Sequence, residues 1–199
     1  GGRCTFRTAH PVKVWPIRIK SATYHGMDVG ALALPRTAAS GSTPAAAIRI
    51  ELECASGINF ADVPLDSLEI HLGWGHETSY RLYELLLTAR CGVVAMRRTP
   101  SGDTEHFIDQ TAQRIEAVGF SRAEAMLPVD ARSFDGYRLL HEYFAFPARF
   151  MSCRFTGLRA AAAGCEAPVL ELVVPLHSED EWLEDHPDLT AHVKLACSP

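Results

Sequence analysis

The side chains of this sequence that could do chemistry are nine histidines, six cysteines and an acidic run near the C-terminal end. His71 and His76 are close enough to share a metal ion, but His71 falls on the polar face of an alternating segment and no third ligand is evident. Gly73-Trp74-Gly75 lacks the third glycine of a dinucleotide-binding turn. We therefore interpret the histidines as surface residues and expect no metal or cofactor site.

Recognised catalytic motifs are missing from the sequence. It contains no GxSxG nucleophile elbow, no Walker phosphate loop and no HExxH zinc motif. We therefore expect that the protein is not an enzyme. A metal-dependent hydrolase built on the histidines stays as an alternative, which bound zinc or manganese would support.

The cysteines fall mostly inside apolar runs, and no two of them form a CxxC pair. This pattern favours buried free thiols in a reducing compartment over disulfides or structural zinc. The six are Cys4, Cys54, Cys91, Cys153, Cys165 and Cys197.

Six of the ten residues from Glu179 to Asp188 are acidic, without the order of a calcium-binding loop. One interpretation is a solvated short helix anchored by Trp182 and Leu183. The other is an acidic docking surface, and the excess of acidic side chains in residues 101–199, 16 against 8 basic, agrees with it. Its residues would be Glu179, Asp180, Glu181, Glu184, Asp185 and Asp188.

The composition is that of a folded domain: 199 residues, 47% hydrophobic, 22% charged, with a net charge of −5. It excludes a disordered chain and a basic nucleic-acid binder, and no apolar run is long enough for membrane insertion. We expect a single domain over 1–199. Because Tyr80-Arg81-Leu82 and Tyr137-Arg138-Leu139 each open a helix that leads to a strand, two related halves could meet near 100–125. The opening Gly1-Gly2 suggests a piece of a longer protein.

Hydrophobic periodicity predicts about eight strands and two main helices. Alternation is clearest where Ile48, Ile50 and Leu52 interleave with charged residues, whereas Leu82, Leu85 and Leu86 have helical spacing. We expect an α+β fold, mainly antiparallel β and sandwich-like, with two amphipathic helices packed on the sheets. Strands are predicted near 12–20, 48–54, 68–74, 93–96, 114–120, 150–155, 169–176 and 193–197, helices over 79–90 and 133–147, loops over 35–46 and 160–164, and a hairpin or loop over 99–113.

Seven aromatic residues crowd into residues 134–155. Their helical and then strand spacing is typical of a core, and a ligand pocket is the alternative. If they are core, Tyr143→Ala or Phe146→Ala should cost about 3–5 kcal/mol of stability. The rings are Phe134, Tyr137, Tyr143, Phe144, Phe146, Phe150 and Phe155.

Residues 127–150, LPVDARSFDGYRLLHEYFAFPARF, closely resemble the signature of the TssF family (also called VasA or ImpG), and Gly157-Leu158 continues it. Weaker similarity covers residues 15–17, 63–68, 83–86 and 195–199, while Ala148 and residues 151–153 depart from the pattern. The signature residues, to which the resemblance gives a structural role, are Ser133, Phe134, Gly136, Tyr137, Arg138, Leu139, Leu140, Glu142, Tyr143, Phe144, Phe146, Pro147 and Phe150.

The TssF family are baseplate subunits of the bacterial type VI secretion system. The resemblance implies a central fragment that acts as a structural scaffold of a baseplate wedge, with no catalysis and no cofactor. It implies TssG, TssK, TssE, the spike protein and a second TssF copy as partners, at the cytoplasmic face of the inner membrane. The alternative is a soluble sugar- or peptide-binding β-sandwich module whose aromatic rings form a groove.

Overall fold

The computed structural model describes residues 13–32, 34, 43–88, 92–98, 104–107, 115–128 and 134–195, which form two antiparallel sheets. The larger sheet has five strands. Their spatial order is β1 (Ile17–His25), β2 (Ala46–Cys54), β8 (Val169–Leu176), β4 (Val94–Arg98) and β5 (Thr104–Phe107). The smaller sheet has the order β6 (Ile115–Ala117), β7 (Ser152–Thr156), β3 (Ser67–Leu72) and β9 (Val193–Leu195).

The core lies between the inner faces of the two sheets. In β2 every second residue is buried, and Ile50 lies opposite Leu172 of β8 in the register. Ile70 and Phe155 of the smaller sheet belong to the same hydrophobic cluster. Alternation with one apolar face is what an antiparallel sheet with a single buried side requires, and it confirms the predicted α+β, mainly antiparallel fold.

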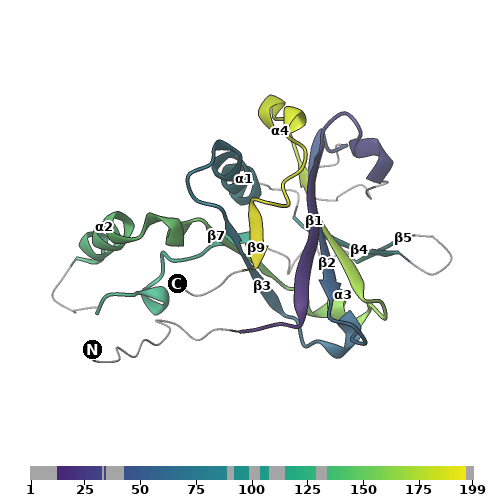
Figure 1. Cartoon of the computed structure of the whole chain (residues 1–199), viewed down its shortest axis with the longest axis horizontal. Coiled ribbons are helices and arrows are strands. Elements are labelled where there is room, and N and C mark those ends of the chain that lie inside the picture. The colour runs from purple at the N-terminus through teal and green to yellow at the C-terminus, as the bar shows by residue number, and fades with distance from the viewer. Residues whose placement is uncertain are drawn as a thin grey trace, which may run out of the picture.

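The two longer helices differ in how they meet the sheets. Helix α1 (Glu77–Thr88) buries Leu82 and Leu86 and contacts β3, β6 and β7. Helix α2 (Asp135–Ala145) contacts mainly the 3₁₀ turn η4 (Pro147–Phe150) and lies at the end of the molecule away from β5 (Figure 1). The shorter elements are α3 (Arg159–Ala163), α4 (Glu181–Asp185), η1 (Val29–Leu32), η2 (Phe60–Asp62) and η3 (Arg122–Glu124).

Several predicted boundaries need correction. The first strand begins at Ile17, after Pro16, and runs on to His25, because its pairing with β2 continues past the alternating stretch. The predicted 160–164 loop is helix α3, whose Ala161 and Ala162 are buried beneath η2. The hairpin interpretation of 99–113 is confirmed by the antiparallel β4–β5 pair. Residues 35–42 of the predicted 35–46 loop lie outside the described residues.

Each sheet takes strands from both halves of the sequence. Strand β8 lies between β2 and β4, and β7 lies next to β3. The organisation as one domain with two related halves stays a prediction. Within the described ranges, no helix combines the length and apolarity needed to span a bilayer.

Candidate functional site

Helix α2 is amphipathic in the opposite sense to a usual surface helix. Its buried side chains are Arg138 and Glu142, which are one turn apart on one side of the helix. Its exposed residues include Leu140 and Phe144, on the other side. The helix therefore turns its charged side toward the protein and its apolar side toward solvent.

Glu142 is the centre of the contacts that hold this helix. Its carboxylate accepts hydrogen bonds from the backbone N–H groups of Met126 (2.9 Å) and Leu127 (3.0 Å). It also pairs with the guanidinium groups of Arg138 (3.1 Å) and Arg149. All three charged side chains are nearly fully buried, so the group is an internal ion network and not a surface salt bridge.

A second ring of contacts extends this network to neighbouring segments. Asp135 accepts hydrogen bonds from Arg138 and from Arg122, both at 3.0 Å. Arg149 also donates to the backbone carbonyl of Glu124, whose side chain accepts from Arg154 at 2.8 Å. These contacts tie α2 to η3, η4 and β7. The orientation of the helix is thereby fixed through its polar side.

The electrostatics of Glu142 follow from the same contacts. Burial by itself raises the pKa of this carboxyl, because an ion loses its hydration. The hydrogen bonds from Leu127 and Arg138, with that from Met126, outweigh burial, and the net effect is a pKa below the ordinary value. Glu142 is therefore a carboxylate held as an anion by its donors.

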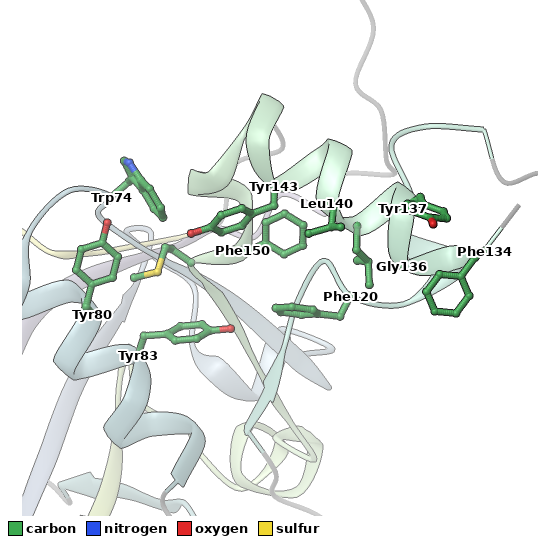
Figure 2. Close-up of a pocket in the computed structure, with 12 residues that line it drawn as sticks. Trp74, Tyr80, Tyr83, Phe120, Phe134, Gly136, Tyr137, Leu140, Tyr143 and Phe150 are labelled. Carbon is green, nitrogen blue, oxygen red and sulfur yellow. The ribbon is translucent and has the colours of Figure 1, made fainter.

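The apolar side of α2 forms one wall of a groove of about 950 Å³, which we call the aromatic groove (Figure 2). Side chains of α2, of α1 and of the β3–α1 turn surround the same space. Trp74 and Tyr80 meet edge to face at 5.5 Å between ring centroids, and Tyr143 lies 5.9 Å from Phe150. The lining residues are Trp74, Tyr80, Tyr83, Phe120, Phe134, Gly136, Tyr137, Leu139, Leu140, Tyr143, Phe150 and Met151.

The prediction that the aromatic run forms the core is therefore wrong for most of its rings. Phe144 is 80% exposed and Phe134 73% exposed, whereas Phe150 and Phe155 are buried as predicted. Helical spacing shows which residues share a face but not which face turns inward. Here the ion network decides, and the other exposed signature side chains are Tyr137, Leu140, Tyr143 and Phe146.

Other signature residues are distributed around the same helix. Gly136 and Leu139 are half-buried in the groove wall, and Pro147 opens η4. Ser133 lies outside the described residues. Trp74, Tyr80 and Phe120 also line the groove, but no sequence pattern links them to α2 because they lie far from it along the chain.

The groove lining is mainly apolar and aromatic. It contains no carboxylate, histidine, lysine, arginine or cysteine side chain among the described residues. Tyr83 is its most shielded hydroxyl, and burial raises the pKa of Tyr83 to about 12. Such a surface suits apolar contact, and tyrosine hydroxyls are the ionisable groups of its lining.

The acidic run has mostly structural contacts. Asp180 caps α4 by accepting from the N–H of Leu183 at 3.0 Å, and it pairs with Arg81 at 3.2 Å. Glu184 accepts from the backbone N–H of Met27 at 3.1 Å. These contacts agree with a short anchored helix. A docking role stays a prediction, and the exposed members are Glu179, Glu181, Asp185 and Asp188.

The described cysteines are buried in the core. Cys54, Cys153 and Cys165 are buried free thiols, and burial raises the pKa of Cys153 to about 12. The other three cysteines lie outside the described residues.

His71 lies 3.1 Å from the Ser152 hydroxyl, and the ring centroids of His76 and His192 are 5.2 Å apart. Within the described part of the chain no three His, Cys, Asp or Glu side chains gather as metal ligands.

We expect the free energy of unfolding to depend on pH because of two of these histidines, His71 and His192. Burial lowers the pKa of His71 and of His192, with Lys194 and His76 adding repulsion. The pKa of a histidine in the unfolded chain is 6.5, so below about that pH the unfolded chain binds protons more readily than the folded one. The free energy of unfolding therefore decreases as the pH is lowered. We expect the urea-unfolding free energy to decrease between about pH 7 and about pH 5, and less steeply in His192→Gln.

The control for this measurement is His141→Gln, on the exposed surface of α2. It should keep the wild-type slope. A double variant, His71→Gln with His192→Gln, that kept the full slope would contradict the assignment.

Comparison with known proteins gives a consistent result. A family model described as "Type VI secretion system, TssF" matches residues 1–199. The chain is 41% identical over 196 residues to the type VI secretion system component TssF1 of Pseudomonas aeruginosa, covering 98% of this chain and 30% of that protein. It also matches a chain in a cryo-electron microscopy structure of the type VI secretion system TssK-TssF-TssG baseplate subcomplex. There the TM-score is 0.71 at 22% identity, over 96% of this chain and 32% of the other. The chain thus spans about a third of the length of these relatives.

Proposed function

Because the chain belongs to the TssF family of the type VI secretion system, we propose that it is a scaffold domain of the baseplate and has no catalytic role. The observation that carries the proposal is the aromatic groove. Its wall is an apolar helix face that an internal ion network holds toward solvent. A rigid apolar surface without acid or base groups is suited to permanent contact with another protein.

The proposed partners are the other baseplate subunits. TssG and TssK come first, because the solved complex with a matching fold is named for TssK, TssF and TssG. We extend the proposal to TssE, to the spike protein and to a second TssF copy. The place of action is the cytoplasmic side of the inner membrane, where the wedge would assemble around the spike and start the sheath.

The sugar- or peptide-binding alternative has less support from the site. Sugar and peptide sites combine rings with several convergent polar groups. Among the described residues that line the groove, the polar side-chain groups are the tyrosine hydroxyls and the Trp74 indole nitrogen. The groove is therefore better matched to an apolar protein surface.

A binding experiment tests the scaffold proposal. We expect the immobilised chain to retain purified TssG or TssK from the same bacterium, and Leu140→Glu to reduce the bound amount at least about tenfold, because it places a charge in an apolar contact. Ala160→Glu is the matched control, since Ala160 is an exposed position of α3, away from α2 (Figure 1). A folded chain that binds neither subunit would contradict a partner-binding role for this region.

A further inference from the structure

Two histidines that are far apart in the sequence come together beside the smaller sheet. His76 is the residue before helix α1, and His192 belongs to the turn that leads into β9. Their rings meet edge to face, with centroids 5.2 Å apart and planes at 71°. His71, which is closer to His76 in the sequence, lies on β3 and contacts Ser152 instead. The pair that the fold brings together is therefore His76 and His192.

The spacing of the two rings is the one that a shared metal ion requires. Zinc binds a histidine nitrogen at about 2.0–2.1 Å, and its ligands are arranged tetrahedrally. Two imidazole rings bound to one zinc ion in this way have centroids roughly 5 Å apart. The observed 5.2 Å agrees with this distance, so the rings need not move apart to share an ion. Because ring contacts without a metal can have the same spacing, the surroundings of the pair decide what it can do.

Backbone contacts hold both histidines in place. The carbonyl of His76 accepts a hydrogen bond from the N–H of Ser79 at 3.1 Å, in the first turn of α1. The N–H of His192 donates to the carbonyl of Leu189, and its carbonyl accepts from the N–H of Gly73, both at 2.9 Å. A methyl group added to Gly73 would lie 3.6 Å from Oγ of Ser79 and 3.9 Å from Cδ2 of His76. The end of β3, the start of α1 and the turn before β9 thus converge at one place.

A buried hydroxyl group orients one of the two rings. Oγ of Ser79 lies 3.2 Å from Nδ1 of His192, and Ser79 is fully buried in α1. A histidine that binds a metal usually donates its other ring N–H to a polar group, which fixes the tautomer and the orientation of the ring. When Nδ1–H donates to Ser79, the free lone pair of His192 is on Nε2. Burial lowers the pKa of His192, and the nearby His76 lowers it further, so this imidazole is neutral at pH 7, as a metal ligand must be.

The remaining groups around the pair limit what a bound ion could do. The charges of Asp188 and Lys194 act on the pKa of His192 in opposite directions. No third His, Cys, Asp or Glu side chain among the described residues joins the pair as a ligand. Catalytic zinc sites have three protein ligands, so a two-histidine site completed by water is a structural link and binds zinc more weakly than a four-ligand site.

We propose that His76 and His192 bind a zinc ion, which links the β3–α1 turn to the segment before β9. The site goes beyond the proposed baseplate role, which would hold with or without it. Trp74 belongs to the same turn as His76 and lines the aromatic groove (Figure 2). Bound zinc would therefore also hold one wall of the groove in place.

Isothermal titration calorimetry of the chelator-treated chain with zinc chloride tests the proposal. We expect a binding site with a micromolar Kd, which His76→Gln and His192→Gln each weaken at least about tenfold, because each removes one of the two protein ligands. His76 is exposed, so its variant should keep the fold, which far-ultraviolet circular dichroism would verify. The matched control is His141→Gln, which removes an exposed histidine of α2 and should bind zinc like the wild type.

Two further measurements identify the ligands. Ser79→Ala removes the hydroxyl that orients His192 and should weaken zinc binding by about tenfold, since losing such an orienting group typically costs about 10- to 100-fold. X-ray absorption spectroscopy of the zinc-loaded chain should show two imidazole ligands, with oxygen in the other positions. A wild-type chain that binds no zinc would overturn the proposal. So would zinc binding that neither histidine variant weakens, or a zinc ion with sulfur ligands, because the ion would then lie elsewhere.

Discussion

Replacing Phe155 with alanine is expected to lower the free energy of unfolding by about 3–5 kcal/mol. Phe155 is fully buried in β7, the strand between β6 and β3. It lies opposite Leu68 in one neighbour and Ile115 in the other. Removing the ring leaves a cavity that the paired strands cannot close. Urea unfolding followed by circular dichroism measures the loss.

The matched control is Phe144→Ala, which removes the same ring from an 80% exposed position. It should change stability by less than about 0.5 kcal/mol. This contrast replaces the expectation from sequence that Tyr143 and Phe146 contribute as core rings. Equal losses in the two variants would mean that the rings of α2 are buried after all.

Much of the two sheets and of helix α1 could be predicted from the spacing of apolar residues. Strand β8 is a nearly continuous apolar run, Val169–Leu176, and is buried almost throughout. The Ile48–Cys54 alternation agrees with β2, and Leu82 and Leu86 are the buried side of α1. In these elements the apolar side faces the core, so the period gives both the element and its orientation.

Helix α2 shows where that reasoning fails. Its period is as clear as that of α1, but the apolar side faces solvent. The deciding contacts join Glu142 to Arg149 and to backbone groups near residue 126, and no local pattern reports them. The signature residues could be identified from sequence, but most of their rings were predicted to be buried and are exposed.

The aromatic groove was beyond sequence analysis for a related reason. Trp74 and Tyr80 come from the β3–α1 region, more than fifty residues before α2. They reach the groove because β7 pairs with β3 and brings the segment after α2 beside the one before α1. Long-range pairing of this kind depends on register and connection, which one sequence does not reveal.

Replacing Glu142 with glutamine is expected to destabilise the protein by about 3–5 kcal/mol, although the side chain keeps its size. The change removes the one carboxylate that faces both Arg138 and Arg149, whose side chains are only 6% exposed. Their two positive charges would then repel each other in a poorly hydrated site. The amide would also offer a single acceptor oxygen where Met126 and Leu127 now share the carboxylate with the arginines. Thermal and urea unfolding measure the loss.

Two further measurements identify the cause. Glu84→Gln removes a carboxylate from an exposed position of α1 and should change stability by less than about 0.5 kcal/mol. Because the folded pKa of Glu142 is lowered, its stabilisation is present above the unfolded value of 4.5 and is lost as pH falls through the folded pKa. The difference between wild type and Glu142→Gln should therefore shrink in acid. A Glu142→Gln variant as stable as wild type at neutral pH would show that the ion network does not hold α2, and the argument for its outward apolar face would fail with it.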